Sequence, residues 1–232
     1  MKILVMGTEE RAAELRQRLS HLTEAEVDFS DGDDDEDFED YDILFDLNYD
    51  DDPDLLAHYA ELKDVPVFVG AVKHALSESA YLSPERITCK LIGMNALPSF
   101  IDREKWELSL LHKPQASDLS EIMEKLGIGY HLVDDRVGMV TPRILLMIIN
   151  EACYTLQEGT ASMEAIDQGM RLGTNYPMGP FAWADAIGVT DVYESLAAIW
   201  EDTRDPRYKI CPLLKTHYLR NKPFYKPQKA GV

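Results

Sequence analysis

The sequence has few cysteines, and they form no recognisable pattern. Cys89, Cys153 and Cys211 are odd in number and far apart, with no CxxC pair and no cluster of histidines. A disulfide framework needs paired cysteines and a zinc site needs grouped ligands, so we expect neither disulfides nor a bound metal. Cys153 stands at helical spacing among apolar residues, which predicts a thiol in the core rather than a nucleophile.

Long hydrophobic runs are also missing. No apolar stretch approaches the length that crosses a bilayer. The apolar part of residues 1–7 is too short for a signal peptide. We therefore expect a cytoplasmic protein that has no membrane as a partner.

Positive charge is scarce in the first part of the chain. Residues 1–140 carry 13 basic residues (Lys and Arg) against 32 acidic residues (Asp and Glu). Residues 141–232 carry 10 basic and 10 acidic residues. The formal net charge of −19 therefore lies entirely in the first part, which predicts two distinct regions. An acidic surface repels phosphate backbones, so we expect no nucleic-acid partner and an unfavourable field for an anionic cofactor.

Apolar residues, by contrast, are plentiful at 45% of the chain, and they follow alternating strand and helix patterns. This alternation is typical of a parallel sheet in an α/β domain. Strands are predicted over residues 2–6, 25–29, 41–47, 65–71, 87–92 and 130–133, and helices over residues 9–19, 54–62 and 117–125.

The first strand is followed by Gly7 and a helix, which is how a dinucleotide-binding unit begins. In the GxGxxG pattern Gly7 fits the first glycine, but Glu9 stands at the second and Ala12 at the third. The side chain and negative charge of Glu9 oppose a pyrophosphate at the helix N-terminus. Asp28 and Asp31 stand near the distance of a ribose-binding acid, so Gly7, Asp28 and Asp31 are the candidate cofactor-binding residues.

A dense acidic block occupies residues 31–40. Like charges repel one another, so such a block is typical of a solvated loop. A calcium site is the alternative interpretation, although the block lacks the ligand spacing of an EF-hand loop.

The second part of the chain contains the strongest helical patterns. A long helix is predicted over residues 142–156, and a second over residues 163–172 with Ser162 as its N-cap. The long helix is apolar on more than one face, so one face can pack inside its own domain while the other meets a partner.

A turn-rich string follows over residues 173–181. Its two prolines fix the backbone, while Gly173 and Gly179 permit conformations that are closed to other residues. The large apolar side chains of the string either line a substrate cleft or pack into a helical corner. The candidate cleft residues are Tyr176, Met178, Gly179, Pro180 and Phe181.

Several segments of this second part resemble the C-terminal domain of the 3-hydroxyacyl-CoA dehydrogenases. They are Asn150-Glu151-Ala152, Glu164 to Asp167, Met170 to Gly173, Tyr176 to Phe181, Asp185 to Gly188 and Pro212 to Lys215. The resemblance implies a reduced Rossmann-like domain over residues 1–137, followed by an all-helical domain over residues 138–232 like the C-terminal domain of 6-phosphogluconate dehydrogenase. It also implies a homodimer formed through the helical domain.

The family's chemistry uses a histidine that takes the hydroxyl proton of the substrate and a glutamate that orients it. By this resemblance the histidine position is Asn95 and the glutamate position is Glu107. An amide cannot act as a general base near neutral pH, so Glu107 has lost the partner that it would orient. His74, on the loop after the fourth strand, is the candidate substitute.

Two functions fit these observations. The sequence favours a dehydrogenase-like protein that has lost NAD binding and catalysis and serves as a dimeric binding or structural partner, for an acyl-CoA or another protein. The alternative is an NAD-dependent oxidoreductase acting on the 3-hydroxyl of a 3-hydroxyacyl-CoA, with His74, or a water held by Asn95 and Glu107, as the base.

Overall fold

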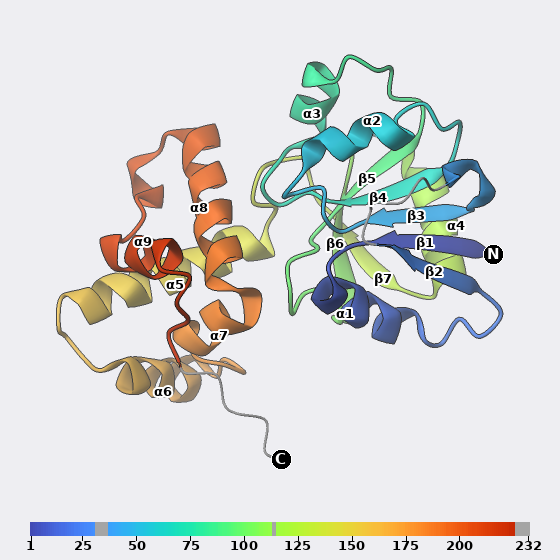
Figure 1. Cartoon of the computed structure of the whole chain (residues 1–232). Helices are drawn as coiled ribbons and strands as arrows, with labels where there is room; N and C mark the ends of the chain where they lie inside the picture. Colours follow the sequence, from blue (N-terminus) through green and yellow to red (C-terminus); the bar gives the residue numbers. More distant parts are fainter. Residues whose placement is uncertain (31–36, 113–114, 226–232) are drawn as a thin grey trace. The chain divides into compact units, whose positions relative to one another are not determined.

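The computed structural model describes residues 1–30, 37–112 and 115–225, and it forms two compact units. The first unit is Met1–Val140 and the second is Thr141–Val232 (Figure 1). Each unit has its own core of buried apolar side chains. No helix in the described part of the chain is long and apolar enough to cross a membrane.

The first unit is built on a seven-stranded sheet with the strand order β2-β1-β3-β4-β5-β6-β7. Neighbouring strands are parallel except at β5 and β6, which are antiparallel. The strands are β1 (Lys2–Met6), β2 (Glu26–Ser30), β3 (Ile43–Asp46), β4 (Pro66–Gly70), β5 (Lys90–Met94), β6 (Lys105–Leu110) and β7 (Gly129–Leu132).

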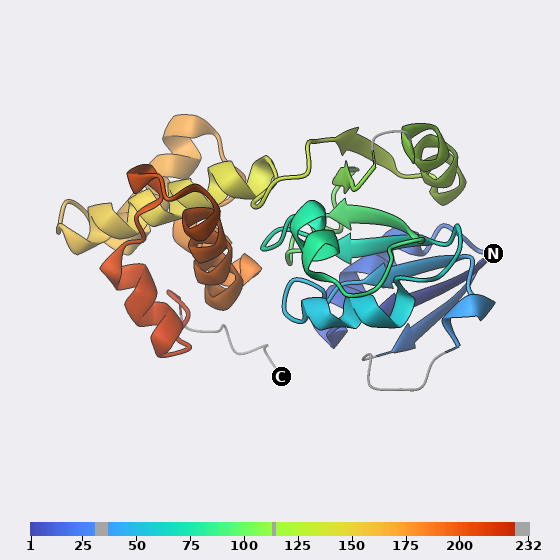
Figure 2. The same cartoon turned by 90° about the horizontal axis from the view of Figure 1, so that it is seen from above.

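Helices cover both faces of this sheet (Figures 1 and 2). The core on one face is made by α1 (Glu9–Leu19) and α4 (Ala116–Leu126), whose apolar side chains pack on those of the central strands. The short helices α2 (Leu56–Tyr59) and α3 (Leu76–Leu82) lie on the other face (Figure 1). Burial on both faces explains why the central strands read as continuous apolar runs.

The second unit is all helical. Its buried side chains include Leu146, Ile149, Phe181, Leu196 and Leu214. The helices are α5 (Thr141–Gln157), α6 (Met163–Thr174), α7 (Pro180–Ile187), α8 (Val189–Thr203) and α9 (Pro212–Leu219).

The sequence prediction of a Rossmann-like sheet domain followed by a helical domain is confirmed, with local corrections. The β6 strand and the α3 helix are additions, and the helix predicted over residues 54–62 is only α2 preceded by a turn of 3-10 helix at Pro53–Leu55. No crossover helix separates β5 from β6, and a short connection of this kind produces antiparallel pairing.

The glycines of the turn-rich string also differ from expectation. Gly173 lies inside α6, and the left-handed backbone is taken two residues later by Asn175, with φ of 56°. Gly179 has an ordinary φ of −76°. Its lack of a side chain is nevertheless required, because a Cβ at this position would overlap the carboxylate carbon of Asp167.

The cysteines are free and buried, and Cys153 is a core residue as predicted, with 0% of its surface exposed. Of the acidic block at residues 31–40, residues 31–36 lie outside the described part of the chain. The calcium interpretation and the candidate Asp31 fall there and stay predictions.

Candidate functional site

The strands β1 and β3 are neighbours and end side by side at the carboxyl edge of the sheet. After β1 the chain continues to α1 on one face of the sheet, and after β3 it continues to α2 on the other face. In open α/β sheets ligands bind at such a switch point. Gly7 follows β1, and a Cβ placed on it would meet the Cβ of Leu47 at 3.0 Å, so Leu47 packs directly on the turn. The turn continues with Thr8, which caps α1 without a side-chain hydrogen bond, and with the exposed Glu9. It offers no glycine cradle for a phosphate.

Arg11, in the first turn of α1, reaches across this switch point. Its guanidinium Nη1 donates to the main-chain oxygen of Leu47 at 2.7 Å and to Oδ2 of Asp51 at 2.8 Å. Only 6% of the Arg11 side chain is exposed. The side chain therefore ties α1 to the loop that follows β3.

Lys73, on the loop after β4, meets the same carboxylate. Its Nζ donates to Oδ1 of Asp51 at 2.6 Å, and 6% of its side chain is exposed, against 42% for Asp51. Partial burial opposes ionisation of Asp51, but the hydrogen bond from Lys73 and the charge of Arg11 outweigh it and hold the pKa of that carboxyl below its usual range. One carboxylate is thus shared by two buried cations.

Two further acids are buried at this edge. Asp50 accepts the main-chain N–H groups of Val72 at 2.8 Å and Lys73 at 2.6 Å, and burial raises its pKa to about 7. Asp46 accepts the hydroxyl of Tyr59 at 2.8 Å, and burial raises its pKa to about 6. Burial dominates in both because removing a carboxylate from water disfavours its charged form.

His74 is half-buried beside these acids. Its ring packs edge to face on Tyr49, with ring centres 6.4 Å apart. Burial lowers its pKa, so the imidazole is neutral at pH 7 and able to accept a proton. Within the first unit it borders a pocket of about 420 Å³, whose lining includes Pro53, Leu56, Glu78, Ser79 and Leu82.

Asn95 directly follows β5, and its main chain lies beside that of Glu107 on β6. The main-chain N–H of Asn95 donates to the main-chain oxygen of Glu107 at 3.2 Å. Asn95 is buried, and its side-chain Oδ1 accepts the N–H of Leu97 at 3.4 Å. The contact between the two residues joins their main chains, and the roles of their side chains stay predictions.

The candidate cofactor-binding residues are less well grouped. Gly7 stands at the carboxyl edge, whereas Asp28 lies inside β2, paired in register with Leu4. The carboxylate of Asp28 accepts the hydroxyl of Tyr41 at 3.1 Å and lies 3.8 Å from Nζ of Lys2. These contacts turn Asp28 toward the start of β1 rather than toward the switch point.

In the helical unit, the turn-rich string is organised around Asp167. This buried carboxylate accepts the N–H groups of Phe181 at 2.9 Å and Ala182 at 3.1 Å, so it caps the start of α7, and it also accepts the hydroxyl of Tyr225 at 3.0 Å. Negative charge at a helix N-terminus is stabilising. The string is held as a packed corner.

The candidate cleft residues separate within this corner. Pro180 and Phe181 are buried in the unit, and the ring of Tyr176 packs on Trp183 at 5.6 Å. Met178 and Gly179 instead border a pocket of about 410 Å³, together with Glu164, Gln168, Arg171 and Tyr225.

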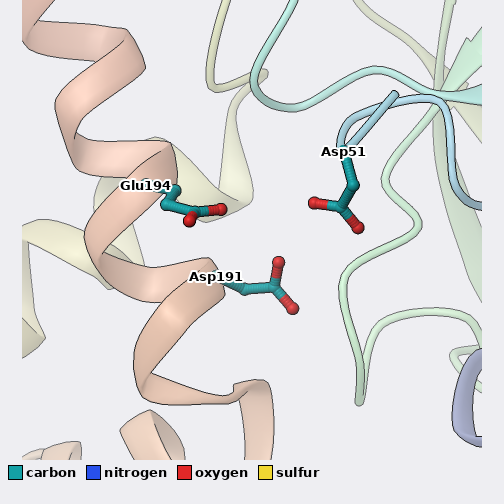
Figure 3. Close-up of side chains that lie close together, drawn as sticks. All are labelled: Asp51, Asp191 and Glu194. Carbon is teal, nitrogen blue, oxygen red and sulfur yellow. The ribbon is translucent and has the colours of Figure 1, made fainter. Parts of the chain in front are cut away.

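Figure 3 draws three carboxylates from the two units. Asp51 belongs to the loop after β3 in the first unit, while Asp191 and Glu194 stand one turn apart on α8 in the second. Inside the helical unit, Glu194 accepts the hydroxyl of Tyr218 at 3.1 Å.

Sequence reasoning missed the group formed by Arg11, Asp50, Asp51 and Lys73. A cation on the apolar face of a predicted helix, beside Ala12, was the available signal for Arg11. For the aspartates it was their position directly after a buried strand, where parallel-sheet proteins place ligand contacts.

Comparison with known proteins gives a family and a fold. The 3-hydroxyacyl-CoA dehydrogenase C-terminal domain family matches residues 138–231. The probable 3-hydroxybutyryl-CoA dehydrogenase of Bacillus subtilis (strain 168) is 42% identical over 102 residues, which are 44% of this chain and 36% of that protein. The chain therefore matches about a third of the length of such curated relatives.

Two further comparisons extend into the first unit. The 3-hydroxybutyryl-CoA dehydrogenase of Clostridioides difficile is 30% identical over 185 residues, covering 77% of this chain and 66% of that protein. The crystal structure of (S)-3-hydroxybutyryl-CoA dehydrogenase from Ralstonia eutropha matches with a TM-score of 0.72 at 22% identity, covering 94% of this chain and 93% of that one. At this identity the structural match shows the fold alone.

Proposed function

Through its C-terminal domain this chain belongs to the 3-hydroxyacyl-CoA dehydrogenase family, and we propose that it is an NAD-dependent oxidoreductase of fatty-acid metabolism. It would oxidise the 3-hydroxyl group of a 3-hydroxyacyl-CoA. One observation carries the proposal: the 30% identity with the Clostridioides difficile 3-hydroxybutyryl-CoA dehydrogenase runs over 185 residues and so includes much of the first unit. Similarity of that extent favours retained activity over the loss that the sequence suggested.

In this proposal the first unit would hold a dinucleotide by charge rather than by a glycine cradle. The turn at Gly7 is packed by Leu47, yet Arg11 and Lys73 are buried cations at the same switch point. These two side chains would hold a pyrophosphate. The nicotinamide, when bound, supplies the hydride acceptor.

His74 is the residue we assign to proton transfer. Its imidazole is held neutral at pH 7 by burial, so a ring nitrogen can accept the proton of the substrate hydroxyl. Asn95 takes no proton, but its amide can donate a hydrogen bond to the same oxygen. Glu107 would act only by positioning Asn95, to which its main chain is already hydrogen-bonded.

We further propose that the helical unit forms a homodimer. Its α5 helix buries Leu145 and Ile149 but leaves Ile144 60% exposed, and Leu172 on α6 is 78% exposed. Large exposed apolar side chains on neighbouring helices favour burial against a second copy. A cytoplasmic location and the absence of nucleic-acid and membrane partners stay predictions of the sequence.

A second candidate function is a dimeric binding or structural partner without catalysis, for an acyl-CoA or a protein. Its support is the amide of Asn95 at the position where the family has its general base. The turn at Gly7, filled by Leu47, also lacks the phosphate cradle of the family. These features favour lost chemistry in an otherwise retained fold.

An NADH titration followed by cofactor fluorescence separates the two functions. We expect saturable binding below millimolar NADH, and NADH oxidation when acetoacetyl-CoA is added. The absence of binding at millimolar NADH would reject the oxidoreductase. Binding without turnover would favour the non-catalytic partner, and acyl-CoA binding would then be measured alone.

A further inference from the structure

The loop that carries His74 is held by Asp50, which lies on the loop after β3. The carboxylate of Asp50 accepts the main-chain N–H of Val72 at 2.8 Å and that of Lys73 at 2.6 Å. These are the two residues before His74, and Asp50 itself is buried. A hydrogen bond is electrostatically stronger inside a protein than in water, so the two bonds fix the main chain that leads into His74.

The imidazole of His74 also contacts this loop directly. Burial lowers the pKa of His74, and a hydrogen bond with the main chain of Asp50 opposes that shift. A hydrogen bond raises the pKa of a histidine when a ring N–H donates, so the acceptor is the main-chain oxygen of Asp50. The ring of Tyr49, which is fully buried, packs edge to face on the imidazole with ring centres 6.4 Å apart. Two neighbouring residues therefore hold the ring, one by a hydrogen bond and one by packing.

A hydrogen bond at one ring nitrogen decides what the other nitrogen can do. A neutral imidazole has one N–H donor and one acceptor nitrogen. When the N–H is directed to the main-chain oxygen of Asp50, the remaining nitrogen is an acceptor. His74 is half-buried and borders the pocket of about 420 Å³, so the ring is not sealed inside the core. This arrangement prepares His74 to take a proton rather than to give one.

We propose that Asp50 and Tyr49 are positioning residues for His74, and that they fix its loop, its ring orientation and its tautomer so that one ring nitrogen can accept a proton. The proposal deepens the proposed function and rests on it for the role of His74 as the base. The state of the imidazole is measured without turnover. Failure of the positioning and failure of the oxidoreductase are therefore distinguishable.

Nitrogen-15 NMR of the full chain tests the proposal, because long-range proton–nitrogen spectra distinguish a ring N–H from an acceptor nitrogen. The spectra are recorded at about pH 8, because burial raises the pKa of Asp50 to about 7 and its carboxyl is then mainly ionised. His74→Gln identifies the signals of the ring. We expect the wild type to show one neutral tautomer. Comparable populations of both tautomers in the wild type would overturn the proposal, and this measurement needs no variant of Asp50 to fold.

Asp50→Asn keeps the size of the side chain but replaces one acceptor oxygen with an NH₂ donor, so one of the two loop hydrogen bonds is lost. We expect the second tautomer of His74 to appear and the ring N–H to exchange with water about tenfold faster. Asp167→Asn is the matched control, since Asp167 is also a buried carboxylate that accepts two main-chain N–H groups, but in the helical unit. It should change the exchange of His74 by less than about twofold. Equal acceleration in the two variants would reject a specific role for Asp50.

Oxidation of 3-hydroxybutyryl-CoA with NAD separates positioning from substrate binding. Asp50→Asn should lower kcat by about 10- to 100-fold and change KM by less than about twofold, because a misplaced base slows proton transfer without weakening the bound substrate. A fall in kcat without any change in the His74 tautomer would overturn the proposal, as would a rise in KM alone. A single tautomer that depends on Asp50, in protein without turnover, would keep the positioning of His74 while rejecting the oxidoreductase.

Discussion

The two units bury charge in different ways. In the first unit Arg11, Asp46, Asp50 and Lys73 are all buried at the carboxyl edge of the sheet, where α/β proteins bind ligands. In the helical unit, within the part that the structure describes, Asp167 is the buried charged residue, and its carboxylate caps α7. The first unit thus concentrates its buried charges at the candidate site. The helical unit uses its buried carboxylate to hold the turn before α7.

This difference explains why the helical unit is easier to recognise. A helical cap and a close-packed glycine restrict the residue types at a few neighbouring positions, and such restrictions keep a recognisable sequence pattern. A switch point can hold an anion by glycines or by cations, so its sequence can change more freely. The family match accordingly begins at residue 138.

The comparison of the two units predicts its largest effect for catalysis, in a variant of the first unit. His74→Ala removes the proposed base, and general bases contribute about 10²- to 10⁴-fold to the rate constant, or about 3–5 kcal/mol. We expect kcat for NADH-linked turnover to fall by that factor. His58→Ala, on α2, is the matched control and should leave kcat unchanged.

The pH profile of the same reaction gives an independent readout. Oxidation of the hydroxyl needs neutral His74, so kcat/KM should rise with pH through the pKa of His74 and then level. Burial holds that pKa below its ordinary value of 6.5, so the rise should be complete before neutral pH. A wild-type profile that is retained in His74→Ala would reject this base.

The helical unit should be more sensitive in stability than in chemistry. Asp167→Ala leaves two main-chain N–H groups and the hydroxyl of Tyr225 without their acceptor, at a cost of about 3 kcal/mol in the free energy of unfolding. Glu164→Ala, exposed on the same helix, should cost less than about 0.5 kcal/mol. Urea unfolding followed by Trp183 fluorescence measures both, and equal effects would mean that Asp167 is not a structural cap.

The first unit should lose stability as the pH rises. Between 3.8 and about 7 folded Asp50 binds more proton than the unfolded chain, so the free energy of unfolding falls across this window and levels above it. We expect a loss on the order of 2 kcal/mol between pH 5 and pH 8. Asp46 contributes in the same direction up to about pH 6.

Urea unfolding followed by Trp106 fluorescence, in a background without Trp183 and Trp200, measures this dependence. Asp50→Asn should flatten most of it, because the amide does not titrate. Asp54→Asn should leave the slope unchanged. A first unit whose stability rises from pH 5 to pH 8 would contradict the burial of a carboxylate at Asp50.

Local patterns made most of the fold predictable. The bounds of β1 and α1 agree with the sequence prediction residue for residue, because each carries its own strand or helix periodicity. The orientation of β6 depends on its partner β5 and not on its own residues. Periodicity carries no information about such pairing.

The candidate site was less predictable for the same reason. Arg11 and Asp51 are 40 residues apart, and only the fold brings their side chains within 2.8 Å. The resemblance assigns Asn95 and Glu107 to family positions, and that assignment stays a prediction. It could not indicate the ion pairs of Arg11 and Lys73 with Asp51, because the family pattern has glycines at that turn.

The smallest predicted effect compares the helix caps of the two units. Ser162 caps α6 by accepting the N–H of Ala165 at 3.2 Å, whereas Thr8 caps α1 with no side-chain hydrogen bond. Ser162→Ala should therefore cost about 1 kcal/mol in the free energy of unfolding of the helical unit, because the N–H of Ala165 loses its acceptor. Thr8→Ala removes a hydroxyl that caps nothing, so it should change the first unit by less than about 0.5 kcal/mol. Urea unfolding with the tryptophans of each unit as probes compares the two variants, and a larger loss for Thr8→Ala would show that the turn after β1 depends on its hydroxyl after all.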